Sequence, residues 1–234
     1  LFRSTFREVL QNSSNPGFVE IGRRLGKKRI YNYVKNFGLT QKTGVDLPGE
    51  SCGIMFDYKN FHELEQATVA FGQGISVTPL QLVTAISACV NGGYLLQPHI
   101  LKEVRNNNNE IIYQAKRKVK RQVIKEETSK KVRDALESVV TDGGGRNAYI
   151  DGYRIGGKTG TAQKAVNGSY VGGGYILSFV GIAPIDDPQI VLYIAMDNPK
   201  NCIQYGGTTV APIARKMFLD ILPALNVKKV KSQR

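Results

Sequence analysis

Two stretches near the start of the sequence place serines in patterns that could support acyl transfer. Ser4 precedes Arg7 with the spacing of an S-x-x-K pair, while Ser13 and Asn15 form an S-x-N sequence. Both patterns occur in enzymes that form an acyl-serine intermediate, in which a nearby base takes the proton of the attacking serine. Arg7 cannot be this base because a guanidinium keeps its proton at physiological pH. We therefore predict that Ser4 is a helix N-cap and not a nucleophile.

A Lys-Thr-Gly sequence that begins at Lys158 could provide the binding side of such a site. On an edge strand, the ammonium of Lys158 and the hydroxyls of Thr159 and Thr161 would suit the carboxylate end of an extended peptide. Gly160 would let the peptide backbone lie close to the strand. The same three letters occur at residues 42–44, ahead of a Pro-Gly pair that favours a turn. This second copy is predicted to be structural.

The same region also fits a phosphate-binding loop. The stretch from Gly152 to Thr159 matches the pattern G-x-x-x-x-G-K-T. An apolar run that ends at Asp197 resembles the strand that holds magnesium in such proteins. A phosphate loop must follow a buried strand and open into a helix, so that the helix N-terminus faces the phosphate. The preceding "TDGGGRNAYID" does not read as a buried strand, and the following "AQKAVNGSYVGGG" does not read as a helix. A P-loop nucleotide-binding enzyme is therefore the alternative to an acyl-serine enzyme.

The hydrophobic pattern predicts an α+β fold: an antiparallel sheet flanked by helices, together with a helical subdomain. Residues 1–93 are mainly helical, and the clearest helix is capped by Thr78 and ends at a Gly-Gly pair. Residues 94–225 read as a hairpin with an asparagine run at its tip, a helix, a sheet that contains the Lys-Thr-Gly strand, and a closing helix. We expect residues 1–225 to be one domain and residues 226–234 to be a basic tail or linker.

The formal charge of +13 and the pI near 9.7 suggest an anionic partner, such as nucleic acid, lipid headgroups or an anionic wall. The cations cluster at residues 116–125 and in the tail, without interleaved aromatic residues. That arrangement favours a solvated basic face over a surface that stacks on bases, so no nucleic-acid partner is predicted. A catalytically silent basic binding domain is a further alternative.

The sequence shows no metal-ligand spacing and no membrane-spanning stretch. Its cysteines, Cys52, Cys89 and Cys202, allow at most one disulfide, and Cys89 lies in an apolar run that predicts a buried thiol. No run approaches the roughly 20 apolar residues of a transmembrane helix, and no signal peptide is visible. Because the first residue is Leu1, we expect a fragment of a protein that is anchored elsewhere.

In combination, the S-x-N sequence at Ser13 and the Lys-Thr-Gly sequence at Lys158 resemble those of the class B penicillin-binding protein transpeptidases. The stretches "FGLTQKTGVDLPGE", "EQATVAFGQGISVTPLQ", "SFVGIAPIDDPQIVLYIAMDNP" and "YGGTTVAPIARKM" are similar to segments of this family in the same order. The resemblance covers nearly the whole chain and favours a sporulation member that acts in spore cortex synthesis. It implies the penicillin-binding protein/β-lactamase-like transpeptidase fold with its N-terminal part missing.

The resemblance implies D,D-transpeptidation. A serine attacks the D-Ala-D-Ala amide of a peptidoglycan stem peptide, releases D-alanine and passes the acyl group to an amine of a neighbouring stem, and β-lactams acylate the same serine. By this resemblance Ser13 would relay protons, and Asn15 would hydrogen-bond the substrate amide and steady the catalytic lysine. Lys158 would place positive charge near the terminal carboxylate. Thr159 and Thr161 would offer it hydroxyls, and the Thr161 N–H would form half of an oxyanion hole.

The resemblance also implies that the nucleophile is not present in this chain, because the family's S-x-x-K lies several dozen residues before the S-x-N sequence. We therefore expect the chain alone to be inactive. The implied ligands are peptidoglycan stem peptides and β-lactams, with no cofactor. The parent protein would be held by an N-terminal helix on the extracytoplasmic face of the cell membrane, or of the forespore membrane for a sporulation member. Divisome or elongasome proteins or a sporulation glycosyltransferase would be its partners.

Overall fold

A three-stranded antiparallel sheet forms the centre of the molecule. The computed structural model describes residues 4–164, 170 and 174–230. Strands β5 (Gly156–Gln163), β6 (Tyr175–Ala183) and β7 (Ile190–Asp197) lie in the order β5-β6-β7. Because β5 lies at the end of this order, it is an edge strand of the sheet. One side of its backbone pairs with β6, and the other side faces away from the sheet.

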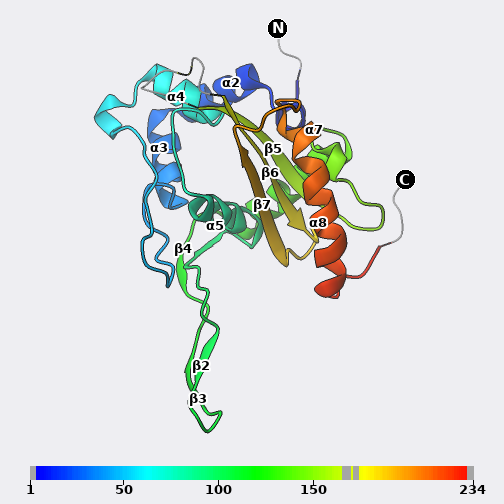
Figure 1. Cartoon of the computed structure of the whole chain (residues 1–234). Helices are drawn as coiled ribbons and strands as arrows, with labels where there is room; N and C mark the ends of the chain where they lie inside the picture. Colours follow the sequence, from blue (N-terminus) through cyan, green and yellow to red (C-terminus); the bar gives the residue numbers. More distant parts are fainter. Residues whose placement is uncertain (1–3, 165–169, 171–173, 231–234) are drawn as a thin grey trace.

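Helices cover the sheet, and a helical subdomain precedes it in the chain (Figure 1). The helical elements of the first part are α1 (Phe6–Gln11), α2 (Asn15–Leu25), α3 (Lys27–Asn36), η1 (Tyr58–Asn60), α4 (Glu63–Ala70) and α5 (Pro79–Val90). Those of the second part are α6 (Glu126–Thr141), η2 (Arg146–Ala148), α7 (Gly206–Thr209) and α8 (Ala211–Ala224). The predicted α+β class with an antiparallel sheet flanked by helices is confirmed.

Local sequence signals explain several of these boundaries. Helix α5 begins after Thr78, whose side chain accepts a hydrogen bond from the backbone N–H of Gln81, as its sequence predicts. The prediction that Ser4 caps the first helix is wrong by one residue. Thr5 is the N-cap of α1, because only Thr5 has a glutamate, Glu8, three residues later to complete a reciprocal capping box.

Apolar clusters pack on both faces of β6, the middle strand of the sheet. Alternate residues of β6, among them Leu177 and Phe179, pack with Phe218 and Leu222 of α8 in one apolar cluster. The opposite face belongs to a second cluster, which joins Ile182 of β6 to buried side chains of α5 and α6. Because α6 also packs directly against β5, the sheet is fixed between α8 on one side and α5 with α6 on the other.

A two-stranded arm projects away from this body (Figure 1). Its strands are β2 (Glu103–Arg105) and β3 (Ile111–Gln114), which pair antiparallel around the predicted asparagine turn at residues 106–109. At the root of the arm, β1 (Tyr94–Leu96) pairs with β4 (Val119–Gln122). The hairpin prediction is confirmed, and the arm makes residues 116–121 the connection between the hairpin and the body.

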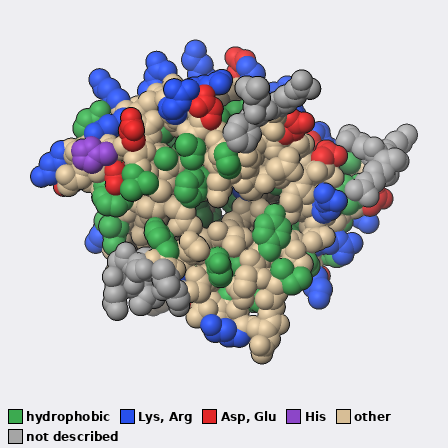
Figure 2. Space-filling model, turned by 90° about the horizontal axis from the view of Figure 1, so that it is seen from above, with side chains coloured by type: hydrophobic (Ala, Val, Ile, Leu, Met, Phe, Trp, Pro, Cys, Tyr) green, Lys and Arg blue, Asp and Glu red, His purple; other side chains and the backbone are tan. Residues whose placement is uncertain are grey.

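The surface combines exposed charge with scattered apolar side chains. In the view from above, Lys and Arg side chains lie mostly around the rim, and a hollow near the centre is bordered largely by apolar and uncharged atoms (Figure 2). Cys52, Cys89 and Cys202 are free thiols, and burial raises the pKa of the partly buried Cys89 to about 12. None of the helices in the described residues has the length and apolar character needed to cross a bilayer.

Replacing Phe218 by alanine tests the packing of α8 on the sheet. The side chain is fully buried, and its ring lies so close to Gly181 of β6 that an added Cβ there would come within 2.5 Å of it. Phe218→Ala is expected to lower the free energy of unfolding by about 3–5 kcal/mol in urea titrations followed by circular dichroism. Leu219→Ala is the control, because that neighbouring side chain is 39% exposed. Equal losses in the two variants would contradict the described core.

Candidate active site

The turn between α1 and α2 presents the Ser13 hydroxyl to the rest of the molecule. Ser13 adopts a left-handed backbone conformation with φ of 51°, which is uncommon for a residue with a side chain. Its N–H donates to the carbonyl of Leu10, and the next N–H donates to the carbonyl of Val9. Ser14 caps α2 by accepting a hydrogen bond from Gly17. These local bonds hold both ends of the turn, so the position of Ser13 is fixed by its own chain.

Lys158 of β5 meets this turn across 145 residues of sequence. Its ammonium donates to Ser13 Oγ and also to the backbone carbonyl of Thr159, at 3.1 Å. The two motifs singled out separately in the sequence therefore meet in the fold. Only the packing of the helical part against the edge of the sheet can create this contact, because no local structure spans that separation.

The Lys158 ammonium lacks an acidic partner in this environment. Among the described residues no carboxylate lies within ion-pair distance of it, and its hydrogen-bond acceptors are a hydroxyl and a carbonyl. Burial lowers the pKa of Lys158 to about 8 from its usual value of 10.5. The site therefore holds a partly dehydrated cation whose charge is not neutralised, which is the electrostatic requirement for binding an anion.

The two threonines of β5 lie on the other face of the strand. Side chains alternate along a strand, so Thr159 and Thr161 share one face while Lys158 points to the opposite one. Thr159 is nearly buried, whereas Thr161 is exposed and its Oγ1 accepts a hydrogen bond of 3.2 Å from the N–H of Gly206. A ligand that contacts both the ammonium and the hydroxyls must therefore lie along the open edge of β5.

Gly160 has a packing role that the sequence did not indicate. A Cβ atom at this position would lie 2.4 Å from the hydroxyl oxygen of Ser178 on β6, which is closer than real contacts allow. A side chain at this position would therefore have to displace the Ser178 hydroxyl, whether or not a ligand approaches. Asn15, the other predicted site residue, is the first residue of α2 and is exposed two positions after Ser13.

A run of glycines after α6, residues 143–145, packs against the elements that carry the site residues. The N–H of Gly144 donates to the carbonyl of Gln11 at the end of α1, and a Cβ at Gly143 would lie 2.7 Å from the same oxygen. On the other side, a Cβ at Gly207 of α7 would lie 2.3 Å from the carbonyl of Gly144. The run is therefore clamped between α1, which positions Ser13, and α7, which contacts Thr161. The clustering of glycines at 143–145 and 206–207 was the only signal of this in the sequence.

The second Lys-Thr-Gly sequence serves a different purpose. The carboxylate of Glu50 accepts hydrogen bonds from the N–H and hydroxyl of Thr43 and from the N–H of Gly44, at 2.5–2.9 Å. Burial opposes the charge on Glu50, but these bonds outweigh it and hold the pKa below its usual value. Thr43 is buried by this arrangement, while Lys42 is exposed. The hydrogen bonds from Thr43 and Gly44 to Glu50 therefore close this segment into a turn.

The phosphate-loop alternative is not compatible with the backbone. Residues 156–163 form one continuous strand, and the chain continues through Thr159 without starting a helix. A loop of backbone N–H groups ahead of a helix N-terminus, which a nucleotide phosphate requires, is therefore missing at residues 152–159.

The fold and the site define a penicillin-binding protein transpeptidase domain. The sequence matches the family model of the penicillin binding protein transpeptidase domain over residues 2–219, and the chain belongs to this family. Its relatives and structural neighbours place it in class B.

Individual relatives narrow the comparison. The chain is 55% identical over 230 residues to stage V sporulation protein D of Bacillus subtilis, covering 98% of this chain and 36% of that protein. It is 32% identical over 226 residues to the probable peptidoglycan D,D-transpeptidase PenA of Neisseria meningitidis, covering 96% and 37%. The crystal structure of penicillin binding protein 3 from Mycobacterium tuberculosis, complexed with ampicillin, aligns with a TM-score of 0.90 at 32% identity, covering 98% of this chain and 53% of that one. The chain spans about a third of the length of these curated relatives.

The unpaired ammonium predicts a specific dependence of stability on pH. The folded protein releases the Lys158 proton near pH 8 and the unfolded chain near pH 10.5, so the unfolded state binds more protons between these values. The contribution of this group to the free energy of unfolding therefore rises with pH in that window. The stability of the natural protein relative to Lys158→Met should rise by about 2 kcal/mol between pH 7.5 and pH 10.

Urea unfolding of both proteins at a series of pH values measures this difference. Lys42→Met is the matched control, because it removes the same charge from an exposed position. If the difference in the free energy of unfolding between the natural protein and Lys158→Met does not change with pH, the description of Lys158 as a buried, uncompensated cation is contradicted.

Proposed function

We propose that this chain forms the substrate-binding side of a serine D,D-transpeptidase that cross-links peptidoglycan stem peptides. A serine Oγ forms a bond to the carbonyl carbon of the penultimate D-alanine, the amide C–N bond breaks, and D-alanine leaves with a proton on its nitrogen. An amine of a second stem peptide then attacks the ester and regenerates the serine. A β-lactam reacts by the same first step, but its opened ring stays attached.

The observation that carries this proposal is the contact between Ser13 and Lys158. A hydroxyl bonded to an uncompensated lysine can pass a proton to the departing amine, because the ammonium restores the proton that the hydroxyl gives up. The same positive charge attracts the carboxylate that ends both a stem peptide and a penicillin. In this proposal Ser13 and Lys158 are the proton relay, and Asn15, next to them, donates to the substrate amide.

The open edge of β5 provides the binding surface in this proposal. An extended peptide can add to an edge strand through backbone hydrogen bonds. The hydroxyls of Thr159 and Thr161 then lie along its path, and the Thr161 N–H serves as one donor of an oxyanion hole. One such donor is typically worth about 3–4 kcal/mol in the transition state.

The attacking serine is proposed to lie outside these 234 residues. The sequence contains no S-x-x-K pattern, and Ser4 is followed at that spacing by Arg7. Arg7 instead donates to the carbonyl of Asp134 on α6, at 3.3 Å. That contact is structural and leaves Ser4 without a base.

The relatives support a more specific setting for this activity. Similarity to stage V sporulation protein D favours a role in the spore cortex, on the extracytoplasmic face of the forespore membrane. We further propose that an N-terminal helix of the whole protein provides the membrane anchor, and that a glycosyltransferase supplies the glycan strands. The ampicillin complex of the structural neighbour supports β-lactams as ligands of the same site.

Labelling by a fluorescent penicillin tests the proposed function and distinguishes the two Lys-Thr-Gly sequences. In the protein at the full length that its gene encodes, Lys158→Ala should lower the second-order rate of acylation about 100- to 1000-fold, because the proton relay through Ser13 and the charge that attracts the carboxylate are both lost. Lys42→Ala should leave this rate within about twofold, because the Lys42 side chain is exposed and only its backbone carbonyl accepts a hydrogen bond, from Lys120.

Each variant is first checked for folding by its thermal unfolding transition. Equal losses of labelling in the two variants would show that β5 is not the binding strand. Labelling of the full-length protein at no serine would refute the transpeptidase proposal itself.

A further inference from the structure

The side-chain amide of Asn147 connects helix η2 to helix α7 next to the candidate site. Its Nδ2 donates a hydrogen bond of 2.9 Å to the carbonyl of Gly207, 60 residues further along the chain. The residue before it, Gly206, donates its N–H to Thr161 Oγ1 at 3.2 Å. Asn147 is therefore joined to Thr161 of β5 through two consecutive glycines, although the two side chains belong to different elements.

The two glycines need support from outside their own segment. Helix α7 has only four residues, and its N-cap residue, Tyr205, makes no side-chain capping bond. A glycine pair also has more backbone freedom than any other pair of residues. Packing against the sheet limits Gly206, because a Cβ atom there would lie 2.5 Å from the carbonyl oxygens of both Gly160 and Ser178. The Asn147 amide holds the second glycine, so each of the two has its own constraint.

The bond from Gly206 determines how the Thr161 hydroxyl can act. A threonine hydroxyl donates one hydrogen bond and can accept two. Thr161 Oγ1 accepts from the Gly206 N–H, and no acceptor for its own proton is found among residues 4–164, 170 and 174–230. Because the Thr161 side chain is exposed, this proton is available to a ligand. An ionised carboxylate, which only accepts hydrogen bonds, is the complementary group.

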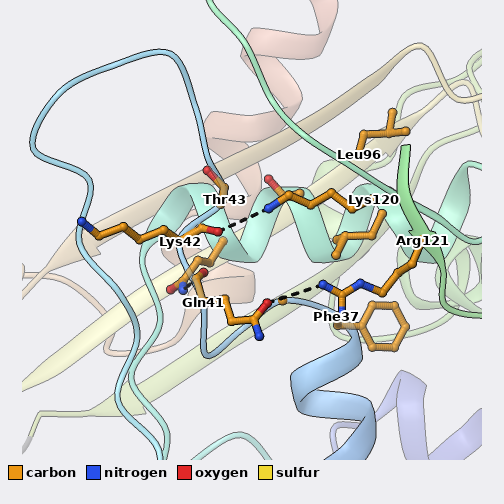
Figure 3. A pocket seen from close by; sticks show the side chains of 11 residues that line it. Phe37, Gln41, Lys42, Thr43, Leu96, Lys120 and Arg121 are labelled. Atoms are coloured by element: carbon orange, nitrogen blue, oxygen red, sulfur yellow. Dashed lines mark hydrogen bonds between the residues drawn. The ribbon is translucent and has the colours of Figure 1, made fainter. Parts of the chain in front are cut away.

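The second Lys-Thr-Gly sequence shows the opposite use of its threonine. The Thr43 hydroxyl donates to the Glu50 carboxylate, so its proton already has an acceptor within the chain. In Figure 3 the side chains of Lys120 and Arg121 hydrogen-bond to this segment, while the Lys42 side chain points away from them. The copy at residues 42–44 is therefore closed by its own chain, and only the copy on β5 keeps a threonine proton free for a ligand.

We propose that Asn147 is a positioning residue for the terminal carboxylate of the acyl donor. By holding residues 206–207, it keeps the Gly206 N–H on Thr161 Oγ1, and the hydroxyl proton is then left to the carboxylate. Without this amide the glycine pair can move, and the Thr161 hydroxyl can rotate away from the ligand. The inference rests on the proposed function. It adds that the preference for a free carboxylate depends on a residue that does not contact the substrate.

Two thioester substrates with the same N-acyl-D-alanyl group test this inference on the full-length protein. The leaving group of one ends in a free carboxylate and that of the other in a carboxamide. The active serine attacks the thioester carbonyl, the C–S bond breaks, and the released thiol is measured to give kcat/KM for each substrate. The ratio of the two values is the carboxylate preference. Asn147→Leu should lower this ratio about five- to tenfold, because a hydrogen bond to a charged group is weakened.

A double-variant cycle tests whether Asn147 acts through Thr161. Thr161→Val removes the hydroxyl itself and should lower the ratio about tenfold or more. Adding Asn147→Leu to Thr161→Val should then change the ratio by less than about twofold. Gln122→Leu is the matched control, because the Gln122 amide also donates to a glycine carbonyl, that of Gly92, but lies on β4 at the root of the arm. This control should keep the natural ratio.

The natural ratio in Asn147→Leu would overturn the positioning role, even if both substrates react more slowly by the same factor, since that loss would be structural. Additive effects in the double variant would also overturn it, because the two residues would then act independently. If the natural full-length protein does not cleave the carboxylate substrate, the proposed function is refuted and the inference with it. Thermal unfolding confirms that each variant folds, and Asn147→Ala replaces Asn147→Leu if the latter does not.

Discussion

The structure depends on keeping one lysine ammonium partly buried beside a hydroxyl without an acidic partner. Burial disfavours the charge on Lys158, and its bonds to Ser13 and to the Thr159 carbonyl do not neutralise it. Such a group is stable only if the surrounding fold is strong enough to hold the α1–α2 turn against β5. The buried clusters on both faces of the sheet provide that strength, and the cost at Lys158 is what leaves the site able to attract an anion.

The elements that bring this pair together act through backbone as much as through side chains. The glycine run after α6 allows carbonyls of α1 and of the run itself to approach at distances that exclude any Cβ atom, and α7 packs on its other side. At Gly160, the absence of a Cβ atom leaves room for the Ser178 hydroxyl of β6. Positions that look like flexible loops in the sequence are therefore among the most tightly packed points around the site.

The sequence was sufficient for the elements, but not for the contacts that build the candidate site. Periodicity and capping residues predicted α5, the hairpin, the strands and α8 because these signals are local. The cap at Thr5 was missed by one residue, since both Ser4 and Thr5 can cap and only the reciprocal bond to Glu8 decides between them. The hydrogen bond between the Gly144 N–H and the Gln11 carbonyl joins segments more than 100 residues apart, so no local sequence pattern could reveal it. Glu50, which closes the second Lys-Thr-Gly turn, was missed because a carboxylate in a turn has many possible partners.

The central claim is that β5, with Lys158 bonded to Ser13, is the strand that receives the substrate. The most direct measurement is a crystal structure of the full-length protein after acylation by penicillin. The account predicts that the β-lactam carboxylate lies along the edge of β5, within hydrogen-bond distance of the Thr159 or Thr161 hydroxyl, and that Lys158 remains bonded to Ser13. An acyl group attached to Ser13 itself, or a carboxylate bound at residues 42–44, would contradict it.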